Sequence, residues 1–201
     1  MIKDFLKNRQ FMIFSVLAVL IILTAVFAPV ITGGADPLTG NIDHALQAPS
    51  REHIFGTDKM GRDIFVRVIY GARASLTSTF GVVILVFLIG TAVGVIAGCF
   101  GGVVDAILMR IADMMVAFPG LVLALAVAGI IGSSMKNAII AITIVSWTKY
   151  ARLARSLVLK IKDRDYVSAA IVSGARTSHI IRSYILPNAL PILIITAATD
   201  V

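Results

Sequence analysis

The sequence is poor in charged residues and in cysteine. Only 14% of its 201 residues are Asp, Glu, Lys or Arg, and 58% are apolar. Soluble domains carry about 25% charged residues, so this composition favours a protein that resides in a lipid bilayer. Cys99 is the single cysteine, which excludes a disulfide framework.

Motifs for catalysis and metal binding are also missing from the sequence. There is no phosphate-binding P-loop, no Ser/His/Asp set and no zinc motif. The three histidines, His44, His53 and His179, lie outside the apolar runs. We therefore expect no bond chemistry from this chain, which would not be an enzyme, and no bound cofactor or metal. A bare nickel site inside the membrane is disfavoured for the same reason.

What the sequence does contain is a series of long apolar runs. They approach or exceed the ~20 residues that cross a hydrocarbon core, and they cover residues 11–31, 76–100, 114–131, 138–151 and about 185–201. We predict an all-α fold, a polytopic transmembrane helical bundle with about five spans. The last run has no charged flank apart from Asp200, so we expect a fragment of a longer protein, truncated at its C-terminal end.

The first run could instead be a signal peptide, with Lys3, Lys7 and Arg9 as its basic region. However, a signal-peptide core has about 7–15 residues, and this run is longer. Pro29 also lies where cleavage after Ala28 would occur. We favour an uncleaved anchor.

The formal charge of +7 could suggest nucleic-acid binding. The basic residues lie at the ends of apolar runs, where the positive-inside rule places them, so we expect no nucleic-acid partner. The basic N-terminus is predicted to lie in the cytoplasm. Counting spans from there places residues 32–75 outside the cytoplasm and residues 149–184 inside it. The inner loop agrees, because it holds eight basic and two acidic residues. The outer segment agrees less well, because it contains five Lys and Arg residues, and we let the inner loop decide.

We divide the chain into three parts. Residues 1–31 form an N-terminal transmembrane anchor, residues 32–75 an external loop, and residues 76–201 an incomplete core with a cytoplasmic loop at 152–184. In the external loop, Gly56 and Gly61 permit tight turns and Asp58 can cap the backbone. From Asp63 the apolar spacing predicts an amphipathic helix along the interface. This loop could contact a partner that delivers substrate, but an elbow that aims the second span is the favoured interpretation.

Several residues within the spans have predicted structural roles. Gly90, Gly94 and Gly98 share one helix face and allow close approach of another helix. Pro119 should kink the third span. Arg110 and Asp113 are three residues apart and can pair on a helix. Two aromatic side chains, Trp147 and Tyr150, are predicted to lie at the membrane interface.

The cytoplasmic loop carries a pattern of small residues. Asp165 is a good N-cap for a helix from Tyr166, and Tyr166, Ala170 and Gly174 follow at four-residue spacing. With Ala169 and Ser173 alongside, this face has little bulk, so the groove of a partner could close over it. Gly174 is a natural helix stop. Ser178 could cap a second helix through residue 185, and Pro187 suits the start of the next span. The alternative is a plain connector of two short helices.

These loop residues resemble a motif of the permease subunits of binding-protein-dependent ABC importers. That family carries Glu-Ala-Ala-x-x-x-Gly, followed further on by Ile-x-Leu-Pro. The sequence here reads Ser168-Ala169-Ala170, Gly174 and Ile185-Leu186-Pro187. Ser168 departs from the family Glu, which would form a capping box with a residue such as Asp165. The loss of that Glu is expected to weaken the cap slightly.

A narrower resemblance is to the second permease of the dipeptide, oligopeptide and nickel branch. It covers nearly the whole chain and rests on five segments, residues 55–63, 70–76, 105–113, 117–119 and 147–155. The resemblance implies a type I importer permease, with about five of its six spans present. It also implies that peptides are the substrate, with nickel or a metal chelate as the alternative.

The family also implies partners and a location. These are a second permease subunit, two ATPases that bind the ATP, an external substrate-binding protein, and the lipid bilayer of a prokaryotic cytoplasmic membrane. The residues that would couple to the ATPases are Asp165, Tyr166, Ser168, Ala169, Ala170, Gly174 and Pro187. The alternatives from other classes are a secondary transporter and a membrane scaffold. A secondary transporter would need ionisable groups near the middle of the membrane and often shows inverted repeats, and the sequence indicates neither.

Overall fold

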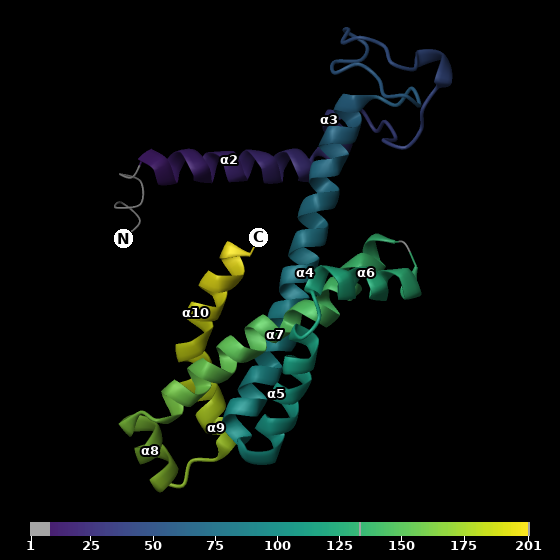
Figure 1. The fold of residues 1–201 in the computed structure, drawn as a ribbon. Coiled ribbons are helices and arrows are strands. Elements are labelled where there is room, and N and C mark those ends of the chain that lie inside the picture. The colour runs from purple at the N-terminus through teal and green to yellow at the C-terminus, as the bar shows by residue number, and fades with distance from the viewer. Residues whose placement is uncertain (1–8, 133, 201) are drawn as a thin grey trace. The chain divides into compact units, whose positions relative to one another are not determined.

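A computed structural model describes residues 9–132 and 134–200, where regular structure is helical apart from one isolated bridge between Thr57 and Asp63. This confirms the all-α prediction. The chain divides into two compact units, residues 1–77 and 78–201, and the boundary falls within a long helix (Figure 1).

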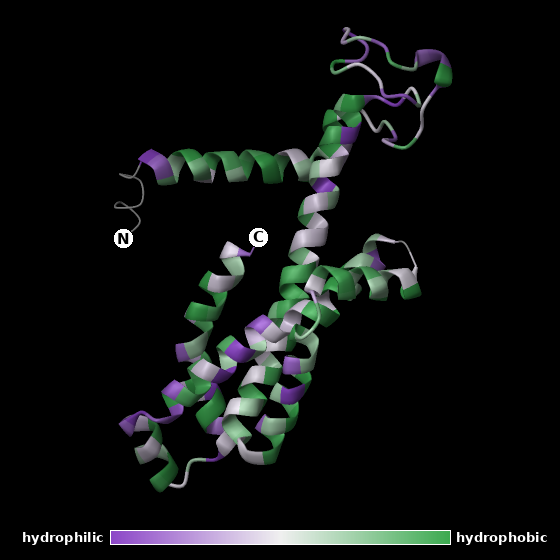
Figure 2. Cartoon of the chain, viewed as in Figure 1, coloured by the Kyte–Doolittle hydropathy of each residue, from purple (hydrophilic) through white to green (hydrophobic). Residues whose placement is uncertain are grey.

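The first unit begins with α2 (Arg9–Val26), followed by the short α3 (Ala28–Ile31). Helix α2 is apolar along nearly its whole length (Figure 2), and Ala25 is its one buried residue. Side chains that are apolar but exposed suit a helix surrounded by lipid. Pro29 lies in the first turn of α3, where its missing N–H costs no hydrogen bond.

After a loop with one short 3-10 turn, η1 (Ile42–His44), the chain enters α4 (Ile64–Phe100). We predicted two elements here, an interfacial helix and a separate span from residue 76. That separation is wrong, because α4 has 37 residues without a break. Its sequence contains no proline that would interrupt it. A helix of this length measures about 55 Å, against about 30 Å for a hydrocarbon core, so α4 can cross a membrane and extend beyond it.

In the second unit, α5 (Gly102–Val116) and α6 (Gly120–Ile131) meet at 91°. We predicted one kinked span over residues 114–131 with Pro119 at the kink. The position was right, but the chain breaks rather than bends. Pro119 has no N–H to donate and disfavours a helical conformation at Phe118. Residues 117–119 therefore separate two helices.

Helix α7 (Met135–Lys162) is twice as long as the apolar run that predicted it. Ser134 caps its start and accepts a hydrogen bond from the Asn137 amide at 3.1 Å. The helix continues past Arg152 as predicted, with hydrophilic residues interspersed along it (Figure 2). Helix α6 packs against α7.

The last elements are α8 (Asp165–Val172), α9 (Thr177–Ile180), a π-helical turn η2 (Ile181–Ile185) and α10 (Leu186–Thr199). The final three follow without interruption, so the predicted fifth span begins earlier than residue 185. The core of this unit lies where α4, α7 and α10 meet, and its largest fully buried side chains are Tyr150, Val158, Val167, Ile185 and Leu193.

By length and composition, three helices of the described part could cross a membrane, or four if the bent α5–α6 pair is one span. The three are α2, α4 and the combined helix Thr177–Thr199. We predicted about five spans. Helix α7 is not in this set, because Lys149, Arg152 and the basic residues that follow lower its hydropathy.

Candidate functional site

Helix α8 has a single buried residue. Val167 is fully buried, whereas Tyr166, Ile171 and Val172 are exposed and Val172 retains 88% of its accessible surface. Ser168 and Ala169 are exposed as well. Exposed apolar residues on a short helix are typical of a surface that a partner covers. The predicted coupling residues 165–170 thus lie on a largely exposed helix, and Gly174 follows its end; α8 is labelled in Figure 1.

The start of α8 differs from the prediction by one residue. Arg164 is the N-cap residue and makes no side-chain capping bond, while Asp165 lies in the first turn. An acidic side chain is favourable there because the helix dipole is positive at its N-terminus. The predicted N-cap at Asp165 is therefore wrong. The expected weakening of a capping box by Ser168 is wrong too, because Ser168 lies four residues beyond the cap and a capping box needs the third.

The end of α8 agrees with the prediction that Gly174 stops the helix. Gly174 has φ +83°, a left-handed conformation that favours glycine. Its amide donates to the Ile171 carbonyl at 2.9 Å, and the Ala175 amide donates to the Ala170 carbonyl at 3.0 Å. This pair of bonds is a Schellman motif. Gly174 therefore defines where α8 ends.

The segment after α8 returns to the core through aromatic contacts. The rings of Tyr166 and Tyr184 lie 5.9 Å apart, and His179 packs edge-on against Tyr184 at 6.0 Å. The second helix begins at Thr177 with Arg176 as its N-cap, so the predicted cap at Ser178 is wrong. Pro187 lies in the first turn of α10, as predicted. A movement of α8 would therefore displace η2 and the N-terminal end of α10.

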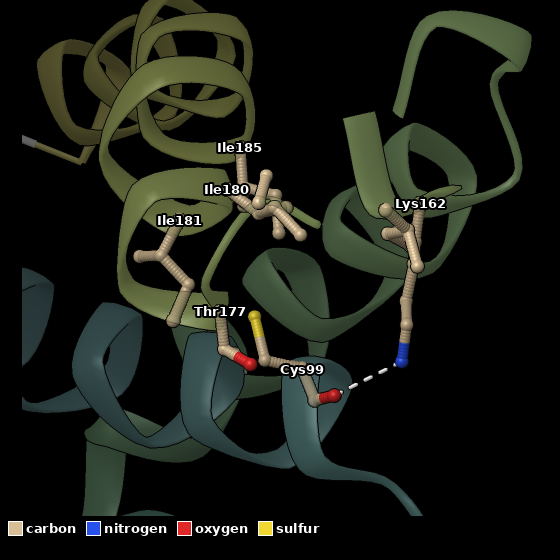
Figure 3. A pocket seen from close by; sticks show the side chains of 8 residues that line it. Cys99, Lys162, Thr177, Ile180, Ile181 and Ile185 are labelled. Atoms are coloured by element: carbon tan, nitrogen blue, oxygen red, sulfur yellow. Dashed lines mark hydrogen bonds between the residues drawn. The ribbon is translucent and has the colours of Figure 1, made fainter. Parts of the chain in front are cut away.

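A cavity of about 210 Å³ lies behind α8, where the ends of α4 and α7 meet α9 (Figure 3). Its walls are mostly apolar, with Ile180, Ile181 and Ile185 on one side. The Lys162 ammonium donates to the Cys99 carbonyl at 2.9 Å. This bond ties the last turn of α7 to the last turn of α4. The apolar walls and the only partly buried Cys99 side chain favour a structural role for this cavity.

Two ion pairs join α7 to α5. Arg155 binds both carboxylate oxygens of Asp105, at 2.5 and 2.6 Å, and Arg152 binds Asp113 at 2.8 Å. We predicted that Asp113 pairs with Arg110 on the same helix. That prediction is wrong, and Arg110 forms no ion pair with any residue of the described ranges. The packing of α5 beside α7 (Figure 1) brings Asp113 to a partner on the other helix.

The three glycines of α4 face α7 at very short range, as expected of residues that allow two helices to pack closely. A Cβ atom on Gly90 would lie 2.5 Å from the Trp147 carbonyl oxygen, and one on Gly94 would lie 2.3 Å from that of Ala151. At Gly98 it would meet Val158 at 2.8 Å. No larger residue fits at these positions without separating the helices.

A further charge cluster joins the middle of α7 to the end of α10. The Lys149 ammonium lies 2.6 and 2.7 Å from the two carboxylate oxygens of Asp200. The Tyr150 hydroxyl donates to the same carboxylate at 2.8 Å. Tyr150 is buried at 2% exposure and packs on Phe87.

The external loop is a network of short hydrogen bonds around Asp58. Its carboxylate accepts from the amides of Met60 and Arg62 at 2.8 and 3.0 Å, and from the side chains of Arg62 and Arg67. The Arg62 amide is the largest of the causes that lower the pKa of Asp58, which falls to about 2. The buried Thr57 hydroxyl accepts from the Gln47 amide and donates to the His44 carbonyl. The turn-forming role predicted for this segment is consistent with these bonds.

Asp63 links this loop to α4. Its carboxylate accepts from the Val66 amide at 3.1 Å and contacts His53 at 2.9 Å. Burial raises its pKa, but the hydrogen bonds from His53 and from the first turn of α4 outweigh burial and lower it. Gly61 has φ +67°, and a Cβ atom there would overlap the Asn41 carbonyl. The loop is therefore a folded structure with little room for substitution.

Comparison with known proteins identifies the family. Residues 90–201 match the family described as binding-protein-dependent transport system inner membrane component. This match covers more than half of the chain. The chain belongs to this family. Residues 1–49 also match the N-terminal TM domain of oligopeptide transport permease C.

Individual relatives of this transport family support the narrower resemblance. The chain is 42% identical over 195 residues to the dipeptide transport system permease protein DppC of Alkalihalophilus pseudofirmus, covering 97% of this chain and 64% of that protein. It is 40% identical over 197 residues to the oligopeptide transport system permease protein OppC of Bacillus subtilis, covering 98% and 64%. The nickel transport system permease protein NikC of Escherichia coli is 37% identical over 166 residues, covering 83% and 60%.

Membership of this inner membrane transport family, together with the apolar helices, makes the protein a multi-pass inner-membrane protein. The chain spans about two thirds of the length of these curated relatives, 64% for the first two. None of the relatives named here is described as an enzyme.

Two ion pairs between distant residues were not predicted from the sequence. The Lys149–Asp200 pair joins residues 51 positions apart, and the Arg155–Asp105 pair joins residues 50 apart. No local spacing rule connects residues so distant. The signal that could have found them is the presence of isolated acidic residues in apolar surroundings, because such residues need a partner.

Proposed function

We propose that this chain is part of a permease subunit of an ATP-driven importer that moves peptides across the cytoplasmic membrane. It would work with a second permease subunit, two ATPase subunits that bind and hydrolyse ATP, and an external substrate-binding protein. The observation that carries the proposal is the exposed α8 helix, whose one buried residue is Val167 and which Gly174 ends. It occurs in a family whose description names binding-protein-dependent transport.

In this proposal α8 is the helix that docks into an ATPase cleft. Its exposed apolar residues, Ile171 and Val172, would enter the cleft, and the small side chains of Ser168 and Ala169 would let the partner approach closely. Asp165 and Tyr166 would lie at its edge. The contacts of Tyr166 with Tyr184 would pass a movement of α8 to η2 and to Pro187 at the base of α10. ATP binding can shift the permease only if the ATPases bind its two states with different affinity.

The docking surface is tested by Val172→Asp in the assembled transporter. Placing a charge in an apolar interface should reduce co-purification of the ATPases by at least about tenfold. Val103→Asp is the matched control, because Val103 is comparably exposed at 74% but lies at the start of α5. Equal association of both variants with the ATPases would contradict docking through α8.

The substrate assignment rests on the relatives, of which DppC and OppC carry peptide transport in their names. NikC keeps nickel, free or as a chelate, as the second candidate. The described residues contain no group of three His, Cys, Asp or Glu side chains that could hold a metal ion. Uptake of dialanine and of nickel by proteoliposomes containing the full transporter and its binding protein separates the two. Nickel uptake without dialanine uptake would overturn the peptide assignment.

A further inference from the structure

The Lys149–Asp200 pair lies between two open cavities of the second unit. One cavity, of about 270 Å³, is lined by Val82, Val83, Val86, Ser146, Lys149, Tyr150 and Asp200. The other, of about 300 Å³, shares Val82, Val83 and Asp200 and continues along α7 toward Met135. Sites for small molecules have volumes of about 300–1,000 Å³. The two cavities together offer room for a small peptide on either side of one ion pair.

The position of this pair along its helices is unusual for charged groups. Lys149 lies about half-way along the 28 residues of α7. Asp200 lies at the C-terminal end of α10, which has 14 residues and therefore places Asp200 about 20 Å from the base of that helix. Most of the other residues that line the two cavities are apolar, with Ser78, Thr79 and Ser146 as the polar exceptions. Ligand sites are typically apolar cavities with a few charged or polar groups that orient the ligand, and this pair has that setting.

The two partners of this pair are held differently. Asp200 is fixed by three donor contacts, two from Lys149 and one from the buried Tyr150 hydroxyl, and its side chain is 28% exposed. The Lys149 side chain is 57% exposed and its flexible stem can turn toward another acceptor. The arrangement is a fixed carboxylate beside a movable ammonium.

We propose that this pair binds the two charged ends of a zwitterionic peptide during its passage, an inference that rests on the proposed function of peptide import. The peptide carboxylate would replace Asp200 on Lys149, and the peptide ammonium would replace Lys149 on Asp200. One ion pair is exchanged for two, so no charge is left unpaired at any stage. A lone cation or a lone anion would leave Lys149 or Asp200 without a partner, which is costly in such surroundings.

The test measures peptide binding directly on the assembled permease and ATPase complex in nanodiscs, without the external binding protein. The probes are radiolabelled dialanine, N-acetyl-dialanine and dialanine amide. We expect removal of either terminal charge to weaken binding by at least about tenfold, because one protein charge then loses its partner. Equal binding of the three probes to the wild-type complex would overturn the proposal without any variant.

Two variants show which protein charge binds which end of the peptide. Asp200→Asn should abolish the preference for dialanine over N-acetyl-dialanine and keep the preference for dialanine over dialanine amide. Lys149→Gln should abolish the preference over dialanine amide and keep the preference over N-acetyl-dialanine. A merely structural pair predicts that each variant weakens all three probes by the same factor, and that result would contradict the proposal. Lys160→Gln is the matched control, since it removes a lysine charge from α7 outside both cavities and should change nothing.

Failure of this binding-site proposal can be distinguished from failure of the proposed peptide import. If the complete transporter imports dialanine but its membrane complex does not discriminate the three probes, peptide import stands and the pair is structural. If the complete transporter imports no peptide, the proposed function fails irrespective of the binding result.

Discussion

Gly90, Gly94 and Gly98 set how closely α4 and α7 can approach. At each position an added Cβ atom would meet the backbone or a Cβ atom of α7 at less than 3 Å. Lipid offers no hydrophobic drive for helix association, so helices in membranes gain stability from close packing of small residues. The sequence spacing predicted a packing face here, but it could not say which helix would cover it.

Gly94→Ala should therefore destabilise the protein. The new Cβ atom would lie 2.3 Å from the Ala151 carbonyl oxygen, and we expect a loss of about 1–3 kcal/mol in the free energy of unfolding. The measurement is the thermal unfolding midpoint in detergent. Gly129→Ala is the control, because nothing lies within 4 Å of its Cβ position, and alanine there should leave the midpoint unchanged or raise it slightly.

The two ion pairs between α5 and α7 should contribute unequally. Arg155 and Asp105 form two parallel bonds with side chains 34% and 18% exposed, whereas Arg152 and Asp113 are 45% and 59% exposed. Double-mutant cycles, with Arg to Gln and Asp to Asn, measure the coupling energy of each pair. We expect about 1–3 kcal/mol for Arg155–Asp105 and below about 1 kcal/mol for Arg152–Asp113. Equal coupling energies for the two pairs would contradict this expectation, because they would show that lower exposure does not strengthen the Arg155–Asp105 pair.

At the scale of elements, α8 shows what a sequence can and cannot define. Its end was predictable because Gly174 needs a left-handed conformation that few other residues adopt. Its start was misplaced by one residue because Asp is favourable both at the cap and in the first turn. The break at Pro119 was located, but its 91° angle was not, since the angle depends on how α5 and α6 each pack against α7.

Gly174→Ala should unwind the last turn of α8. Alanine at φ +83° is strained by about 1 kcal/mol, so the exposed residues before it would lose their fixed position. We expect several-fold weaker association with the ATPases, measured by co-purification. Gly33→Ala is matched, because Gly33 also has a positive φ and open surroundings but lies in the external loop. The same loss in both variants would rule out a specific role of α8.

The external loop should loosen at acidic pH. The pKa of Asp58 is about 2 in the folded loop, below the value of about 3.9 in an unfolded chain. Its hydrogen bonds therefore stabilise the loop fully above about pH 4, and this contribution is lost as the pH falls toward 2. The measurement is cleavage by pepsin between residues 40 and 63 over pH 2–4.5.

Asp58→Asn removes the ionised acceptor, so we expect the loop to be cut readily across this pH range. Asp43→Asn changes a carboxylate of the same loop for which the described residues provide no hydrogen-bond donor, and it should retain the wild-type pH profile. A wild-type profile in Asp58→Asn would show that Asp58 does not hold the loop together.

At the scale of the whole molecule, the sequence predicted the class of fold but not the extent of the helices. Apolar runs show where a helix can contact lipid, and they do not show where it continues through polar residues. Helix α7 therefore extends well beyond its run, and α4 joins two predicted elements. The charge pairs that join α5, α7 and α10 depend on contacts between distant residues and appear only in the folded chain.

Membrane orientation gives the broadest test, because the proposed function requires α8 to face the cytoplasm. In a Cys99→Ser background, a single cysteine at Val172 or Lys160 should react with an impermeant maleimide in inside-out vesicles and not in intact spheroplasts. A cysteine at Met60, which is 57% exposed in the external loop, should react in spheroplasts only. Lys160 precedes α8 in the chain, so it reports the side of the membrane even where an ATPase shields Val172. Labelling of both positions from outside would place α8 in the external compartment, beyond the reach of any ATP-hydrolysing partner, because ATP is supplied in the cytoplasm.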